Sequence, residues 1–274
     1  MPELNNGPQE EPRRREFGFP DFWPVVEAGY PRFVEVGPKA LAAMHSVADR
    51  AYPEPEPHQR VILNLSMLAG ISFVEVVTLT VNGLGHGAMK ILRSLLETSI
   101  NTEYFRLRPA EFEDYREWYH VERFKEMEYL REHANAIFQQ LAPEAVTEIE
   151  NSFTRVRPRF QRADGSVRRF WCSLDLAARS AVTGHQESYR LINPLASSFV
   201  HETMYGLMRH FDAARDVHRV EVPPTFDWAK ESLSGSQHCM VRVVRTLSET
   251  FNVASNPPVE ELEQDWHYAW AEAR

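Results

Sequence analysis

Hydrophobic residues recur along this 274-residue chain mainly at the three- and four-residue spacing of helices, and they are densest between about Pro57 and Leu107. That stretch is divided by Asn82-Gly83-Leu84-Gly85, a turn that predicts two long helices, at about 57–82 and 85–107, folded back antiparallel. Prolines and glycines delimit further helices, which we expect at about 38–51, 109–140, 143–156, 173–182, 185–213, 227–251 and 258–273. The sequence therefore predicts an all-α fold, a single multi-helix bundle around a long antiparallel hairpin.

Three segments depart from the helical pattern. Asp164-Gly165 is a tight-turn signal, so we expect a short β-hairpin or a loop near 157–170. The segment 217–226, VHRVEVPPTF, is expected to be extended. Residues 1–18 are polar and lack the apolar stretch of a signal peptide. We expect a disordered tail there, followed by one helical domain at 19–274.

The composition is that of a globular protein, with 43% hydrophobic and 25% charged residues, and only 12 glycines, which favours helix. Cys172 and Cys239 lie far apart and outside any CxxC pattern, so we expect buried thiols and neither a disulfide nor a zinc site. Reduced thiols and the missing signal peptide predict a cytoplasmic protein.

The segment from Val61 to Leu79 is long and apolar enough to resemble a membrane span. Glu75 within it would be costly in lipid, and no basic loop flanks the segment to set an orientation. We therefore expect a buried core helix and no membrane partner.

A polar stripe is predicted inside the hairpin. If the turn centres on Leu84, Glu75 lies level with Arg93, and Arg93 and Glu97 share one face of the second helix. Buried charges persist only when they are paired, so these three residues are expected to form one network. The network either fixes the helix register or holds Arg93 ready for an anionic ligand.

A later helix carries Ser198 and His201 on one face, in LASSFVHETMYGL. His201 is either a structural hydrogen-bonding residue or a titratable group that meets the Arg93 stripe. In the second case the candidate catalytic residues are His201, Arg93, Glu97 and Ser198, with Glu75 in a supporting role.

The segments GHGAMKILRSLLETSINTEYF, FWCSLDLAARSAVTG and YRLINPLASSFVHETMYGL resemble an uncharacterised bacterial helical family, known only as a domain of unknown function. In that family an LxRSxLE helix precedes a Trp-led short helix and a Tyr, Ser and His pattern. The resemblance covers about 60–212 and implies a helical fold without implying an activity. The matching positions are Arg93, Glu97, Trp171, Tyr189, Ser198 and His201.

A more distant likeness is to the HEPN ribonucleases, helical toxins and phage-defence effectors that pair an Arg with a His one or two turns later on one helix. This chain departs from that motif, because Pro194, Leu195 and Ala196 stand where the Arg would precede His201. Under this likeness the arginine would have to come from another helix, as Arg93. Arg179 and His185 also match loosely, across an expected helix break at Thr183-Gly184.

An Arg-rich stretch, RVRPRFQRADGSVRRFW, interleaves arginines with aromatic residues, as nucleic-acid binders do. The alternative is a solvated turn, or one that pairs with the Glu-rich helix at 109–133. The candidate nucleic-acid or phosphate-binding residues are Arg155, Arg157, Arg159, Arg162, Arg168 and Arg169.

Other chemistry is not indicated. Glu117 and His120 have the ExxH spacing of half a di-metal site, but the second half is missing, and no nucleotide-binding or nucleophile motif occurs, so we expect no metal and no cofactor. The net charge of −9 disfavours a nucleic-acid coat protein.

Two functions remain. The first is a helical sensor or interaction module of a bacterial defence or stress system, forming a homodimer and binding a nucleic acid, another phosphate ligand or a protein. The alternative is a metal-independent, HEPN-like ribonuclease in which His201 is the general base and Arg93 stabilises the phosphate.

Overall fold

The computed structural model describes residues 19–51, 55–201 and 224–272, and within them it is helical throughout, apart from turns, loops and one isolated β-bridge. The all-α prediction is confirmed. In chain order the helices are η1 (Pro20–Phe22), α1 (Trp23–Gly29), α2 (Pro31–Ala48), α3 (Pro57–Val81), α4 (Gly85–Leu107), η2 (Pro109–Glu111), α5 (Phe112–His133), α6 (Asn135–Phe138), α7 (Pro143–Phe160), α8 (Leu176–Val182), α9 (Gln186–Val200), α11 (Ala229–Phe251) and α12 (Val259–Glu272).

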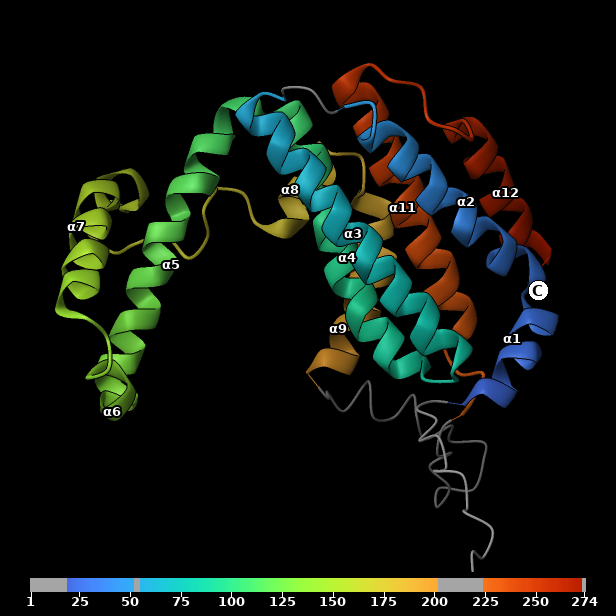
Figure 1. Ribbon diagram of the computed structural model, residues 1–274, viewed down its shortest axis with the longest axis horizontal. Helices are drawn as coiled ribbons and strands as arrows, with labels where there is room; N and C mark the ends of the chain where they lie inside the picture. Colours follow the sequence, from blue (N-terminus) through green and yellow to red (C-terminus); the bar gives the residue numbers. More distant parts are fainter. Residues whose placement is uncertain (1–18, 52–54, 202–223, 273–274) are drawn as a thin grey trace, which may run out of the picture.

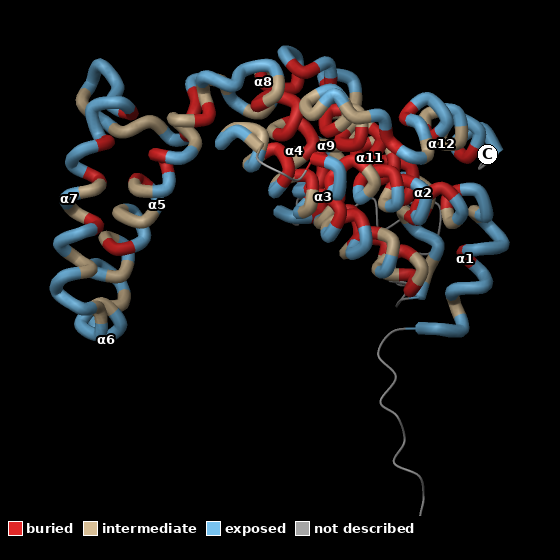
Figure 2. The backbone as a smooth tube through the Cα atoms, turned by 45° about the horizontal axis from the view of Figure 1, so that its top comes forward, coloured by how far each residue is buried: buried red, intermediate tan, exposed pale blue. Residues whose placement is uncertain are grey.

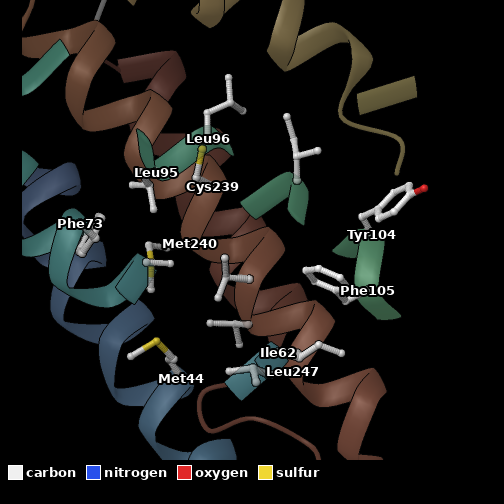
Figure 3. Close-up of a cluster of buried hydrophobic side chains, with 14 of the residues drawn as sticks. Met44, Ile62, Phe73, Leu95, Leu96, Tyr104, Phe105, Cys239, Met240 and Leu247 are labelled. Carbon is white, nitrogen blue, oxygen red and sulfur yellow. The ribbon is translucent and has the colours of Figure 1, made fainter. Parts of the chain in front are cut away.

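The predicted hairpin of α3 and α4 is the centre of a bundle, and α11 packs against both of its helices as well as against α2 and α12. Helix α9 covers α4, while α5, α6 and α7 form an arm that projects from the bundle (Figure 1). The core gathers large apolar side chains from α2, α3, α4 and α11, among them Met44, Phe73, Leu95 and Met240 (Figure 3). Cys172 and Cys239 are both buried.

Two glycines let α11 approach the hairpin closely. A Cβ at Gly85, the first residue of α4, would overlap the backbone carbonyl oxygen of Asp227 just before α11. A Cβ at Gly235, inside α11, would lie 2.8 Å from Leu92 Cδ2. Three small serines, Ser232, Ser234 and Ser236, are also buried around Gly235, which lets neighbouring helices pack closely against α11.

The helix boundaries differ from the predictions where proline was taken as a limit. Helix α2 begins at Pro31 and continues through Pro38, and α7 continues through Pro158 to Phe160. Both helices bury apolar residues on each side of the proline, such as Val36 and Ala40, and this packing outweighs the local cost of the ring. The predicted helix at 109–140 is divided at Ala134 into α5 and α6.

The predicted turn at Asp164-Gly165 is confirmed as a short hairpin, in which Gln161 and Val167 form an antiparallel bridge. Gly165 has a φ of 81°, and Asp164 accepts hydrogen bonds from the backbone and hydroxyl of Ser166. The predicted disordered tail at 1–18, the end of the predicted helix at 185–213 and most of the predicted extended segment at 217–226 lie outside the described residues.

Helix α3 was predicted to be buried, but only one of its faces is. Residues such as Ile62, Phe73 and Val76 are buried, whereas Leu68 and Ile71 on the opposite face are 54% and 57% exposed. No described helix covers that face (Figure 2). The length and composition of α3 would also allow it to cross a membrane, but a single helix of this kind is weak evidence for a membrane span.

A polar network is buried between α4, α9 and α11. The Thr183 carbonyl oxygen accepts hydrogen bonds from His185 Nδ1 at 3.2 Å and from Arg242 at 2.8 Å, and His185 Nε2 shares a hydrogen bond of 3.1 Å with Ser99 Oγ. Burial, reinforced by the positive charge of Arg242, lowers the pKa of His185 to about 4. The ring is therefore neutral at pH 7, as its position inside the bundle requires.

We predict that Gly85→Ala lowers the free energy of unfolding by about 2–4 kcal/mol, because the added methyl group meets backbone that cannot move away. Gly87→Ala is the matched control on the same helix, since its Cβ would make only ordinary contact with Leu79 at 3.5 Å. There the gain in helix propensity should leave stability equal or raise it by up to about 1 kcal/mol. Urea unfolding of both variants measures the difference, and equal losses would contradict the close approach.

We also predict an acid-sensitive fold. Since His185 has a pKa of about 4 in the folded chain against 6.5 when exposed, its neutral form stabilises the fold above pH 6.5, and this stabilisation is lost as the pH falls towards 4. The loss amounts to roughly 3 kcal/mol for this residue. In His185→Asn the free energy of unfolding should be lower at pH 7 but depend less on pH. His133→Asn, at an exposed position, should keep the slope of the wild-type protein.

Candidate functional site

The predicted pairing of Glu75 with Arg93 is not formed. Glu75 is exposed on the outer face of α3 and takes part in no ion pair within the described residues. The hairpin turn sets which residues lie level, but Glu75 follows Val74 on the face that α3 turns away from the core, while its neighbour Val76 points inward. The expected buried network is therefore wrong.

Arg93 and Glu97 lie half-buried on α4, and neither makes an ion pair with another described residue. The Nε atom of Arg93 is buried without a described hydrogen-bond partner. Ser198 is buried and donates its hydroxyl to the carbonyl oxygen of Leu195 in its own helix at 2.6 Å, so its hydrogen bond is structural.

His201 lies away from Arg93. Helix α9 runs antiparallel to α4, since His185 is bonded to Ser99 and the ring of Phe199 lies 5.3 Å from that of His86. This register puts His201, the exposed residue that ends α9, level with the turn at Leu84. Arg93 is about nine residues further along α4, or about 13 Å along the axis. The described structure does not bring the two predicted catalytic residues together.

The Arg-rich stretch is divided between two roles. Arg155 pairs with Glu117 at 2.8 Å, Arg168 with Asp114 at 3.6 Å, and Arg159 also with Asp114. For these three arginines the alternative of pairing with the acidic helix is confirmed. Arg157, Arg162 and Arg169 are exposed and make no ion pair with a described residue.

The structure points instead to a cleft of about 770 Å³ where α5 leaves the bundle beside the start of α3, which we call the elbow cleft. Four of its residues belong to α3 and eight to α5. They are Pro57, Arg60, Val61, Asn64, Phe112, Tyr115, Arg116, Glu117, Trp118, Tyr119, His120 and Glu122.

An aromatic junction holds α5 at this place. Trp171 stacks on Phe105 of α4 with ring centroids 5.1 Å apart, and Tyr115 of α5 packs edge-on against both rings at 5.4 and 4.9 Å. Burial, with a smaller contribution from Glu122, raises the pKa of Tyr115. The junction fixes the angle at which α5 leaves and thereby the width of the cleft.

The carboxylates of the cleft are already occupied. Buried Glu117 is bound by Arg155 and also by Arg116 at 3.4 Å. Glu122 accepts a hydrogen bond from Trp118 Nε1 at 2.9 Å. The charge of Glu117 is thus compensated within the chain, whereas the exposed Glu122 keeps its charge.

Two polar groups of the cleft are not engaged in this way. Arg60 is exposed, and its guanidinium reaches only the carbonyl oxygen of Pro55, at 3.4 Å, without an ion pair among the described residues. The Nδ1 atom of His120 is buried and has no described hydrogen-bond partner. Among the described residues, the Arg60 guanidinium at this cleft thus has no opposite charge, and the His120 ring has one nitrogen that is shielded from water and unsatisfied.

Sequence reasoning had set Glu117 and His120 aside as half of a metal site, and the described residues contain no group of three or more candidate metal ligands. The signal for the cleft was the run Tyr115, Trp118 and Tyr119, aromatic residues three or four apart on an otherwise strongly charged helix. Trp118 and Tyr115 pack towards the core and Tyr119 is exposed, so the same run of aromatic residues supplies both the packing of α5 and an exposed ring at the cleft.

The comparison with protein families matches residues 60–218 to "Family of unknown function (DUF5677)". The expected resemblance to an uncharacterised helical family, at about 60–212, is thereby confirmed. No curated protein and no solved structure matches the chain. Because the match covers more than half of the 274 residues, the chain belongs to this family of unknown function, DUF5677.

Proposed function

We propose that the protein is a helical sensor or interaction module whose elbow cleft binds a small ligand with a flat ring and a phosphate group, such as a nucleotide. The observation that carries the proposal is the pair of unengaged groups, Arg60 and His120, in a cleft walled by aromatic side chains. A volume of about 770 Å³ is in the range of small-molecule sites.

The two walls offer complementary contacts. On α5 the ring of Tyr119 is largely exposed and lies edge-on to His120, with centroids 5.5 Å apart, so a base can stack on it. Stacking of a base on an aromatic side chain is worth about 1–3 kcal/mol. On α3 Arg60 supplies the fork of donors that suits a phosphate, and the exposed amide of Asn64 lies one turn away.

The charge distribution favours a single nucleotide over a long nucleic acid. Because Glu117 is paired with Arg155, a single phosphate near Arg60 has to tolerate only the charge of Glu122 from these two carboxylates. A long polyanion would run along the acidic arm of a chain with a net charge of −9, where repulsion increases with every phosphate. The defence or stress context expected from the sequence stays a prediction, as does the ribonuclease alternative.

Calorimetric titration of the full chain with AMP, ADP, GDP and inorganic phosphate tests the proposal. We expect the nucleotides to bind and phosphate alone to bind more weakly, since it lacks the ring. Arg60→Ala should weaken nucleotide binding about tenfold, because a charge-assisted hydrogen bond is lost. His120→Ala should weaken it as well, and the emission of Trp118 should change on binding only where the cleft is intact.

Arg190→Ala is the matched control, since Arg190 is an exposed arginine of α9 outside the cleft and should bind as the wild-type protein does. The proposal fails if no nucleotide binds at millimolar concentration. It also fails if Arg60→Ala, folded as judged by circular dichroism, binds as tightly as Arg190→Ala.

A further inference from the structure

The outer face of α3 carries an apolar patch with polar ends, which we call the outer stripe. Leu68, Ile71 and Val74 form its centre and are 54%, 57% and 47% exposed. Arg60 and Asn64 precede them, and Glu75 and Thr78 follow, all of them exposed and within about one third of the helix circumference. Three neighbouring aliphatic side chains in water are unfavourable, so the stripe fits an interaction surface.

The stripe is open in the described structure. Helix α3 packs on α4 and α11 with its opposite face and meets α1 and α2 only at smaller contacts, and it lies in front of α4 in Figure 1 with no described helix over it. The arm of α5 to α7 leaves to one side and bounds the stripe at the elbow cleft, which shares Arg60 and Asn64 with it.

We propose that a second copy of this chain occupies the outer stripe, with the two α3 helices packed antiparallel about a two-fold axis between Leu68 and Ile71. In this arrangement Leu68 of each copy lies level with Ile71 of the other, and residues whose numbers sum to about 139 face each other. Asn64 then lies level with the partner's Glu75. Arg60, one turn earlier, is within the reach of its side chain from the same carboxylate.

The charges of the stripe favour this occupant over a lipid surface or an unrelated helix. A two-fold axis brings the basic end of one stripe to the acidic end of the other. Arg60 of each copy then lies near the oppositely charged Glu75 of the other copy, so the stripe is complementary to a second copy of itself. A lipid surface would instead have to desolvate the Glu75 carboxylate next to Ile71 without an opposite charge from a partner.

Sedimentation velocity of the full chain over a range of micromolar concentrations measures the association. We expect a dimer that Ile71→Asp dissociates, raising the dissociation constant at least about tenfold, since the central apolar contact is lost on both sides of the axis. Leu191→Asp is the matched control, because Leu191 is 68% exposed on α9 and outside the stripe, and it should leave the dimer unchanged.

A charge exchange tests the register. Asn64→Glu should weaken the dimer, because on each side of the axis the new carboxylate lies level with the Glu75 carboxylate of the other copy. Adding Glu75→Lys should restore the dimer, because both of these repulsive contacts become attractive. Within one chain these positions are eleven residues, or about 16 Å, apart on α3, so their coupling reports contact between copies.

A monomeric wild-type protein at all concentrations overturns the proposal, as does a dimer that Ile71→Asp leaves intact. A wild-type chain that stays monomeric and binds neutral phosphatidylcholine vesicles through Ile71 assigns the stripe to lipid instead. These measurements contain no nucleotide, so they test the dimer separately from the elbow cleft; because Arg60 belongs to both surfaces, a phosphate bound to it would compete with the partner's Glu75.

Discussion

The close approach of α11 to the α3–α4 hairpin is the contact on which the rest of the structure depends. It is possible because Gly85 and Gly235 leave room for the Asp227 carbonyl oxygen and for Leu92. With α11 packed there, the hydroxyl groups of Thr80 and Ser232 form a hydrogen bond of 2.9 Å. The buried residues of both hairpin helices then face a continuous core. Packing at this density makes the orientation of α3 about its own axis a consequence of α11.

The orientation of α3 in turn decides what the surface offers. Once Phe73 and Val76 face the core, Leu68 and Ile71 must face outward, because they lie on the other side of the same helix. The start of α3 then brings Arg60 to the wall of the elbow cleft, while the junction of Trp171, Phe105 and Tyr115 brings α5 to the other wall. Core packing thus positions the outer stripe, and the aromatic junction positions the elbow cleft, which borders the stripe at Arg60.

The sequence was sufficient to predict the α3–α4 hairpin, but not which face of α3 is buried. The turn at Asn82-Gly85 determines both helix ends, because Gly83 adopts a φ of 67° that other residues avoid, and the predicted bounds agree with α3 and α4. Which side of α3 is buried depends on α11, about 150 residues later, so the placing of Glu75 could not be inferred. The elbow cleft could not be predicted for the same reason, since Arg60 and His120 line one cleft because the junction at Trp171 holds α5 there.

The histidines show why function belongs at the perimeter of this bundle. His185 is buried and His238 half-buried, their pKa values are lowered to about 4, and each shares a hydrogen bond with a serine hydroxyl, Ser99 or Ser188. The neutral His185 ring, bonded at both nitrogens inside the core, has neither an acidic proton to give at pH 7 nor access to a substrate. His120 differs in its position, because its ring lines an open cleft, and its Nδ1 has no described hydrogen-bond partner. A ring nitrogen that is shielded from water and unsatisfied is costly for an isolated fold, and a ligand that supplied a hydrogen-bond partner would remove that cost.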